Sequence, residues 1–188
     1  VGCGAGGVAV CSAGLIGERR PRDLLLPGFE IALANLSPDG GDAAALAIMT
    51  TDTVPKMATV TADGFVVRGM AKGAGMLAPG LATMLSTITT DADVDAPTLP
   101  RVLEVACSET FDRIDSDGCM STNDTVLLLA SGASELKPSE QDLQAAVTSV
   151  CKQLSRALIA DAEGASKEIK ITVRSAATGA DALEVARA

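Results

Sequence analysis

The amino-acid sequence predicts a protein of the α+β or layered α/β class. Predicted strands and helices follow one another along the chain, and no internal repeat or linker separates domains. The clearest single element is an amphipathic helix after Ser139, in which apolar residues recur every three or four positions. The 188 residues, of which 47% are hydrophobic and 21% charged, are enough for one substantial core or two small ones.

The first part of the chain contains apolar segments punctuated by turn residues. A Ser-Pro-Asp-Gly-Gly break at 37–41 separates two segments that are typical of helices, and Asp63-Gly64 is typical of a tight hairpin turn. In chain order we expect a strand at 8–12, helices at 21–36 and 42–49, and a hairpin at 57–70.

The second part continues with strands and helices in turn. Ser139 is the expected N-cap of the clearest helix because an acidic residue, Asp142, follows three positions later, and Gly164 is expected to close that helix. Residues 169–173 alternate between apolar and polar, which predicts a half-buried strand. The other expected elements are strands at 84–89 and 126–130, a helix at 99–111 and a last helix from 179.

Charge and hydropathy exclude several classes of partner. A net charge of −9 without a basic stripe predicts that the protein does not bind nucleic acid, since phosphate binding depends on clustered Lys and Arg. The apolar runs are far shorter than the ~20 residues of a membrane span, and no signal sequence opens the chain. We therefore expect a cytoplasmic protein with no membrane partner. Because the chain begins without Met and stops inside a predicted helix, we expect a fragment of a longer protein.

The residue types that are missing narrow the chemistry further. With no histidine, this stretch cannot form a Ser-His-Asp triad, a Cys-His pair or a zinc site that uses His. With no Trp or Tyr and only three Phe, aromatic cages and base-stacking platforms are disfavoured. The five cysteines are odd in number and widely spaced, which predicts buried free thiols in a reducing compartment.

A glycine-rich segment leads up to Thr83. Residues 69–82 bring a flexible backbone to this Thr, and an apolar, β-prone run follows it at once. Without histidine, hydroxyl catalysis needs a Lys, a carboxylate, or the α-amine that Thr83 gains if it becomes a new N-terminus; free α-amines titrate near ~8. Two interpretations fit this pattern: an N-terminal nucleophile, or a glycine-rich loop that feeds a core strand.

Longer strings of residues bear on this choice. The segment Met70-Ala-Lys-Gly-Ala-Gly-Met-Leu-Ala-Pro-Gly-Leu-Ala-Thr-Met-Leu85 resembles the cleavage-site signature of the ornithine acetyltransferase (glutamate N-acetyltransferase) family. Four other segments are similar to family segments and occur in the family's order: 11–17, 47–56, 117–124 and 161–164. The resemblance covers most of the chain and implies a self-processing, layered α/β sandwich of mixed sheets with helices outside.

The resemblance also implies a reaction. The precursor would cut itself between Ala82 and Thr83, so residues 1–82 would end an α chain and 83–188 would begin a β chain that stays associated with it. Thr83 would then take an acetyl group from N-acetylornithine and pass it to glutamate by a ping-pong mechanism, with no cofactor. We expect the protein to form an oligomer. Its expected binding partners, apart from its own chains, are these small-molecule substrates. Whether acetyl-CoA is also a donor stays open.

Residue by residue, the resemblance places substrate contacts at Thr50, Lys72, Thr83 and Glu163. The Lys72 ammonium, set among glycines, can reach a substrate carboxylate or lower the pKa of the new α-amine; otherwise it is a solvated surface Lys. Glu163 is expected in the last turn of the Ser139 helix, where the helix dipole disfavours an anion and a substrate ammonium would relieve that cost. A frayed, solvent-exposed Glu163 is the alternative.

One position departs from the family. Where the family has Ser-Thr-Gly, whose Thr hydroxyl and Gly amide form an oxyanion hole, this chain has Ser12-Ala13-Gly14. Gly14 N–H can remain a donor, but the hydroxyl donor at Ala13 is lost, and losing one such donor typically costs ~10² to 10³ in rate. Two other functions therefore stay open: a related self-processing amidohydrolase or aminopeptidase, and a non-catalytic truncated homologue.

Overall fold

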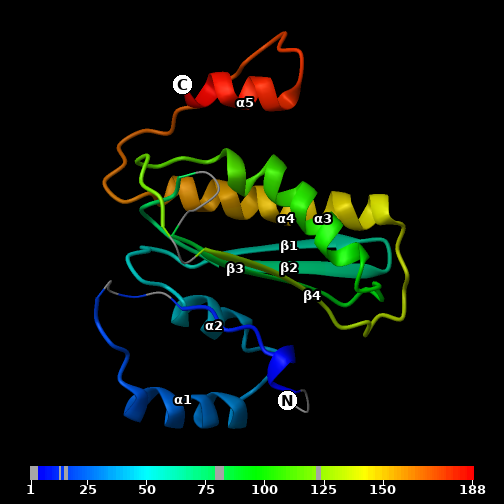
Figure 1. Ribbon diagram of the computed structural model, residues 1–188. Coiled ribbons are helices and arrows are strands. Elements are labelled where there is room, and N and C mark those ends of the chain that lie inside the picture. Colours follow the sequence, from blue (N-terminus) through cyan, green and yellow to red (C-terminus); the bar gives the residue numbers. More distant parts are fainter. Residues whose placement is uncertain (1–3, 13, 15–16, 79–82, 122–123) are drawn as a thin grey trace.

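The computed structural model describes residues 4–12, 14, 17–78, 83–121 and 124–188, and these residues confirm the α+β class. Four strands form one mixed sheet in the order β1-β2-β3-β4, with helices on both sides of it (Figure 1). The strands are β1 (Lys56–Ala62), β2 (Phe65–Lys72), β3 (Leu85–Thr90) and β4 (Thr125–Ala130). The helices are α1 (Arg22–Ala34), α2 (Gly41–Ala47), α3 (Thr98–Glu109), α4 (Glu140–Ala160) and α5 (Gly179–Arg187), with short 3₁₀ turns η1 (Ala5–Gly7) and η2 (Phe111–Arg113).

The hairpin expected around Asp63-Gly64 is present as β1 and β2. Gly64 has a φ of +83°, the left-handed conformation that such a turn requires and that glycine adopts without strain. β3 pairs antiparallel with β2, and β4 pairs parallel with β3 through a crossover that contains α3. The segments before and after Thr83 are therefore neighbours in one sheet.

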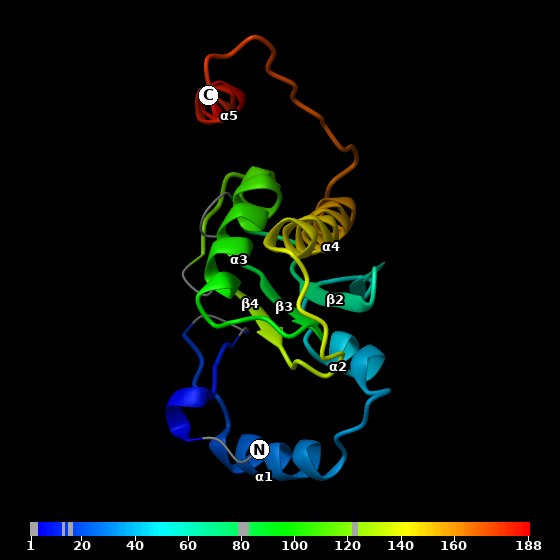
Figure 2. The same ribbon diagram turned by 90° about the vertical axis from the view of Figure 1, so that its right-hand side faces the viewer.

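The core lies between the sheet and the helices α3 and α4 (Figure 2). Ser139 caps α4 as expected, because its side chain accepts the Asp142 N–H at 3.1 Å. Gly69 allows α4 to approach β2, since a Cβ at this position would lie 2.7 Å from Val150 Cγ1. The buried apolar side chains include Val67, Ile88, Val102, Leu143, Val147, Val150, Leu154 and Leu158.

Three predicted elements differ from the structure. Residues 8–12 and 169–173 contain no strand at the positions that the structure describes, and Ile169 is 81% exposed. Alternating polarity is a property of one segment, whereas a strand also needs the backbone of a neighbour to pair with, and the described strands pair only with one another. The helix after Ser139 ends at Ala160 instead of continuing to Gly164.

Of the cysteines that the structure describes, two are buried or half-buried and two are exposed, and Cys3 lies outside the described residues. Cys107 and Cys151 lie in the core region as free thiols, and burial raises their pKa values to about 11 and about 12. Cys11 and Cys119 are also free but exposed, so the expectation of buried thiols is wrong for these two. Their exposure follows from their positions in irregular segments outside the core.

Candidate active site around Thr83

Thr83 lies two residues before β3, at the end of the sheet where β2 finishes. Its backbone N–H donates to Met76 O at 2.7 Å, and the next amide, Met84 N–H, donates to Asp124 Oδ1 at 3.1 Å. The Thr83 hydroxyl is buried and has no hydrogen-bond partner among the described residues. A buried hydroxyl without a partner is costly and uncommon in a structural role. This hydroxyl is free to engage another group.

Lys72 ends β2 and lies beside the start of β3, because the strand register pairs it with Leu85. It is only 1% exposed, and its Nζ donates to Thr50 Oγ1 at 3.4 Å. Burial lowers the pKa of Lys72 from its ordinary value, while the charges of Asp52 and Asp124 act in the opposite direction. The alternative of a solvated surface Lys is therefore wrong. Thr50 and Lys72 are in contact, and their roles in substrate binding stay predictions.

The backbone after Lys72 turns in a conformation that requires glycine. Gly73 has a φ of +147°, and a Cβ on it would lie 3.0 Å from Thr83 O. Its N–H donates to Asp52 Oδ1 at 2.7 Å. The glycine thus permits the close approach of the Lys72 strand to the backbone of Thr83.

Glu163 also reaches this end of the sheet, but from a loop and not from a helix. Its N–H donates to Ala74 O at 2.6 Å, and its Oε2 lies 3.5 Å from the position that a Cβ on Gly75 would occupy. The dipole argument for Glu163 is therefore wrong, because α4 ends three residues earlier. The side chain itself is exposed, as in the solvent-exposed alternative, although its backbone holds it beside the glycine-rich segment.

A buried ionic network behind Thr50 was not predicted from the sequence. Lys56 Nζ contacts Asp52 Oδ1 and Asp161 Oδ2, each at 2.6 Å, and Lys56 and Asp52 side chains have no exposed surface. Asp161, the C-cap residue of α4, also accepts the N–H and hydroxyl of Thr53. Burial opposes ionisation, but these hydrogen bonds and the Lys56 charge lower the pKa of Asp161 to about 2.

Asp124 is a second carboxylate that the sequence did not single out. Burial raises its pKa to about 6, against the effects of the Met84 N–H and the Lys72 charge. Its Oδ2 is buried and has no hydrogen-bond partner in the described part of the chain. Asp52 and Asp124 both lie inside segments that resemble the family. That resemblance could have pointed to them, but nothing in their spacing shows that they lie near Lys72 or Thr83.

Some predicted site residues are not brought together. Ala13 and Ala82 lie outside the described residues, so the cleaved bond and the lost hydroxyl donor stay predictions. Gly14 is described and exposed; a Cβ on it would meet the Arg20 guanidinium at 3.3 Å. No hydrogen bond among the described residues joins Gly14 to the Thr83 end of the sheet, and its role as an oxyanion donor stays a prediction.

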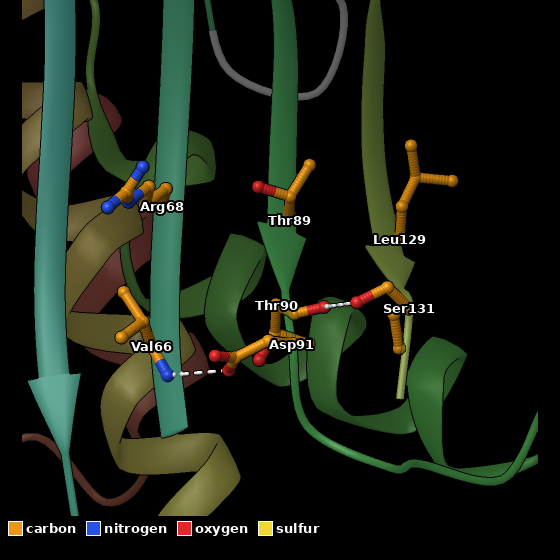
Figure 3. A pocket seen from close by; sticks show the side chains of 8 residues that line it. Val66, Arg68, Thr89, Thr90, Asp91, Leu129 and Ser131 are labelled. Carbon is orange, nitrogen blue, oxygen red and sulfur yellow. Dashed lines mark hydrogen bonds between the residues drawn. The ribbon is translucent and has the colours of Figure 1, made fainter. Parts of the chain in front are cut away.

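A pocket lies at the end of the strands opposite to Thr83. It has a volume of about 440 Å³ and is formed where β2 begins and where β3 and β4 end (Figure 3). Two of its polar side chains bond to backbone: Asp91 Oδ1 accepts Val66 N–H at 2.7 Å, and Ser131 Oγ donates to Thr90 O at 3.4 Å. The pocket is lined by Val66, Arg68, Thr89, Thr90, Asp91, Leu129, Ala130 and Ser131, none of which belongs to the Thr83 site.

The Thr83 site combines groups that suit an amino-acid substrate. Thr83 carries a buried hydroxyl, Lys72 a buried ammonium and Glu163 an exposed carboxylate, and their roles as nucleophile and substrate contacts stay predictions. Four parts of the chain that are distant in sequence supply these groups and their supports, namely residues 50–56, 72–77 with 83–84, 116–117 with 124, and 161–163. The geometry is therefore compatible with acyl transfer through Thr83.

Comparison with known proteins agrees with the motifs. The family model of the ArgJ family matches residues 1–188. The arginine biosynthesis bifunctional protein ArgJ of Streptomyces avermitilis is 63% identical over 183 residues, 97% of this chain and 48% of that protein. Proteins of the same name from Streptomyces coelicolor and Mycobacterium tuberculosis H37Rv are 60% and 55% identical, with 49% and 46% of their lengths covered.

The chain spans about half the length of these curated relatives. None of the helices that the structure describes is both long and apolar enough to cross a membrane. The match over the whole chain and the identities above 50% confirm the resemblance that the motifs indicated, and the chain belongs to the ArgJ family.

Proposed function

We propose that the full-length protein is a self-processing glutamate N-acetyltransferase of arginine biosynthesis, with Thr83 as its nucleophile. The observation that carries this proposal is the buried, unbonded Thr83 hydroxyl at the start of β3. It lies at the end of the sheet that also holds the buried cation Lys72 and the carboxylate of Asp124. Membership of the ArgJ family supports the same reaction.

The first step is cleavage before Thr83. Its Oγ attacks the carbonyl carbon of residue 82, the C–N bond breaks as the amide nitrogen takes up a proton, and an ester forms. Water then hydrolyses the ester, which leaves a carboxylate on residue 82 and a free α-amine on Thr83. This amine can then act as the general base in a sequence that has no histidine.

The two chains would stay together after the cut. β1 and β2 come from the segment before Thr83, and β3 and β4 come from the segment after it. β2 and β3 are joined by a ladder from Val67↔Thr90 to Lys72↔Leu85, and α4 packs on β1 and β2. The α and β chains thus share one sheet and one core, which supports their association.

Transfer then proceeds in two half-reactions. Thr83 Oγ attacks the acetyl carbonyl of N-acetylornithine, the amide bond breaks, and ornithine leaves after its nitrogen takes up a proton. The acetyl group remains on Thr83 as an ester until the amine of glutamate attacks it and restores the hydroxyl. The α-amine of Thr83 accepts and returns the proton, and no cofactor takes part.

The described residues divide the work of binding. Lys72 receives the substrate α-carboxylate, and Thr50, which contacts Lys72, completes that contact. Glu163 receives the δ-ammonium of ornithine. Gly14 N–H supplies the oxyanion hole, where Ala13 leaves one hydroxyl fewer than the family pattern, so the rate is expected to be low for the family.

Three further properties belong to this proposal. The name of the relatives, bifunctional protein, supports a second activity in which acetyl-CoA acetylates glutamate. An oligomer of the cleaved α and β chains is proposed as the working form. A biosynthetic role on small amino acids supports a cytoplasmic location.

The test is made on the complete protein. N-terminal sequencing of the purified protein should find a chain that begins at Thr83, and Thr83→Ala should remain uncut while Thr83→Ser still cleaves. Without glutamate, N-acetylornithine should release no more than one ornithine per Thr83 site, whereas repeated turnover should require glutamate and yield N-acetylglutamate. A single uncut wild-type chain would contradict the proposal, and acetate release that is independent of glutamate would indicate a hydrolase instead.

A further inference from the structure

We propose that Asp52 is a positioning residue for this site: its carboxylate holds Thr50 and Gly73, the residue after Lys72, and places a negative charge near the Lys72 ammonium that receives an anionic substrate. The inference rests on the proposed function, because it concerns how the substrate carboxylate is received. Asp52 is 8% exposed and lies in the loop between α2 and β1.

Both oxygens of Asp52 are occupied by groups of the site. Oδ2 accepts Thr50 N–H at 3.1 Å, and Oδ1 accepts Gly73 N–H at 2.7 Å. Thr50 and Lys72 are the two proposed contacts to the substrate carboxylate, and Gly73 follows Lys72 directly. One carboxylate therefore determines the spacing of both contacts.

Asp52 is itself fixed by Lys56. The ammonium of Lys56 lies 2.6 Å from Asp52 and 2.6 Å from Asp161, which ends α4 two residues before Glu163. This link connects the loop of Thr50 to the segment that carries Glu163. The contacts for the two charged ends of the substrate are thus held by one buried network.

The charge of Asp52 matters as well as its hydrogen bonds. Lys72 has no carboxylate within ion-pair distance in the part of the chain that the structure describes. Burial disfavours its charged form, and the charges that act against this are Asp52, from the loop before β1, and Asp124, from the segment before β4. Glu163 lies beside Gly75, and Lys56 is paired with Asp52 and Asp161.

The test is the pH dependence of kcat/KM for N-acetylornithine in the full-length protein. In Asp52→Asn the amide keeps the size of the side chain but removes its charge, so Lys72 should lose its proton at lower pH. We expect the pH at which kcat/KM falls on the alkaline side of the profile, the basic limb, to be lower by about one pH unit or more. Titration of the substrate is common to all variants and cancels in the comparison.

Asp161→Asn is the matched control. It takes from Lys56 its other carboxylate, but Asp161 is not among the charges that act on Lys72. Its basic limb should therefore stay at the wild-type pH, even though the protein unfolds more easily. If both variants move the limb equally, the shift reflects general loosening and the inference is wrong.

A second variant and a second measurement cover the cases in which the first cannot be read. If Asp52→Asn does not fold, Asp52→Asn/Lys56→Met/Asp161→Asn removes all three charges of the buried network together. Removing such a group as a unit is often tolerated, and this variant should still lower the pH of the basic limb. NMR titration of labelled lysine at position 72 gives the same comparison without turnover, so it holds even if the proposed reaction fails. An unchanged Lys72 titration in a folded variant overturns the role of Asp52.

Discussion

Lys56 and Lys72 are a natural pair for one decisive prediction, because both are 1% exposed but differ in their partners. Lys56 contacts two carboxylates at 2.6 Å. Lys56→Met leaves these carboxylates buried without a cation, and breaking such a pair typically costs about 3–5 kcal/mol. Because the relatives of this chain are about twice its length, each kcal/mol should shift the melting temperature of the full-length protein by less than the ~2–4 °C typical of 150–250 residues, so we expect a fall of several degrees.

Lys72→Met should have the opposite effect on stability. Because burial lowers the pKa of Lys72 in the folded state, the folded protein holds this proton less tightly than the unfolded chain does. The protonated Lys72 therefore costs stability at neutral pH, and the cost disappears as the pH rises toward 10.5. Met removes the cost, so the melting temperature at pH 7 should be unchanged or higher.

The effects on activity should reverse this order. A hydrogen bond to a charged group contributes about 1.5–3 kcal/mol, so Lys72→Met should lower kcat/KM about 10- to 150-fold. Thermal unfolding by circular dichroism and steady-state transfer to glutamate, both on the full-length protein, measure the two quantities. If Lys72→Met melts as early as Lys56→Met, Lys72 is a structural lysine and its assigned role is wrong.

Three further variants test other parts of the site. Glu163→Gln should leave the melting temperature unchanged and raise KM for N-acetylornithine about tenfold or more, since only the proposed ammonium contact loses its charge; an unaltered KM would remove Glu163 from the site. Ala13→Thr should raise kcat by about one to three orders of magnitude with little change in KM, and an unchanged or lower kcat would mean that other donors form the oxyanion hole. Asp124, whose pKa of about 6 lies above its ordinary value of 3.8, should make the wild type lose stability as the pH rises from about 4 to about 6, a slope that Asp124→Asn should abolish in urea unfolding.

Local signals predicted the fold where a segment determines its own structure. The cap at Ser139 and the turn at Asp63-Gly64 are present because one hydrogen bond and one left-handed glycine are local properties. The alternating segment 169–173 shows the limit of such signals, since its side chains fit a strand but no described neighbour pairs with it. Pairing partners are a property of the whole fold.

In the candidate site too, local features could be predicted from the sequence and contacts between distant segments could not. Thr83 and Lys72 were expected from the glycine-rich segment and its resemblance to a family. The burial of Lys72, however, and the contact of Lys56 with Asp161 across 105 residues depend on how β1, β2 and α4 pack. No spacing in the sequence encodes these contacts, which is why Asp52, Lys56 and Asp124 were missed.

Mass analysis of the β chain shows directly whether Thr83 carries the acetyl group. The full-length protein would be incubated with N-acetylornithine alone, quenched in acid to preserve the ester, and compared with a sample to which glutamate was added. We predict that the chain beginning at Thr83 gains the mass of one acetyl group, that fragmentation places this group on Thr83, and that glutamate removes it. A β chain that never gains an acetyl group while N-acetylglutamate still forms would contradict the account, because transfer would then bypass Thr83.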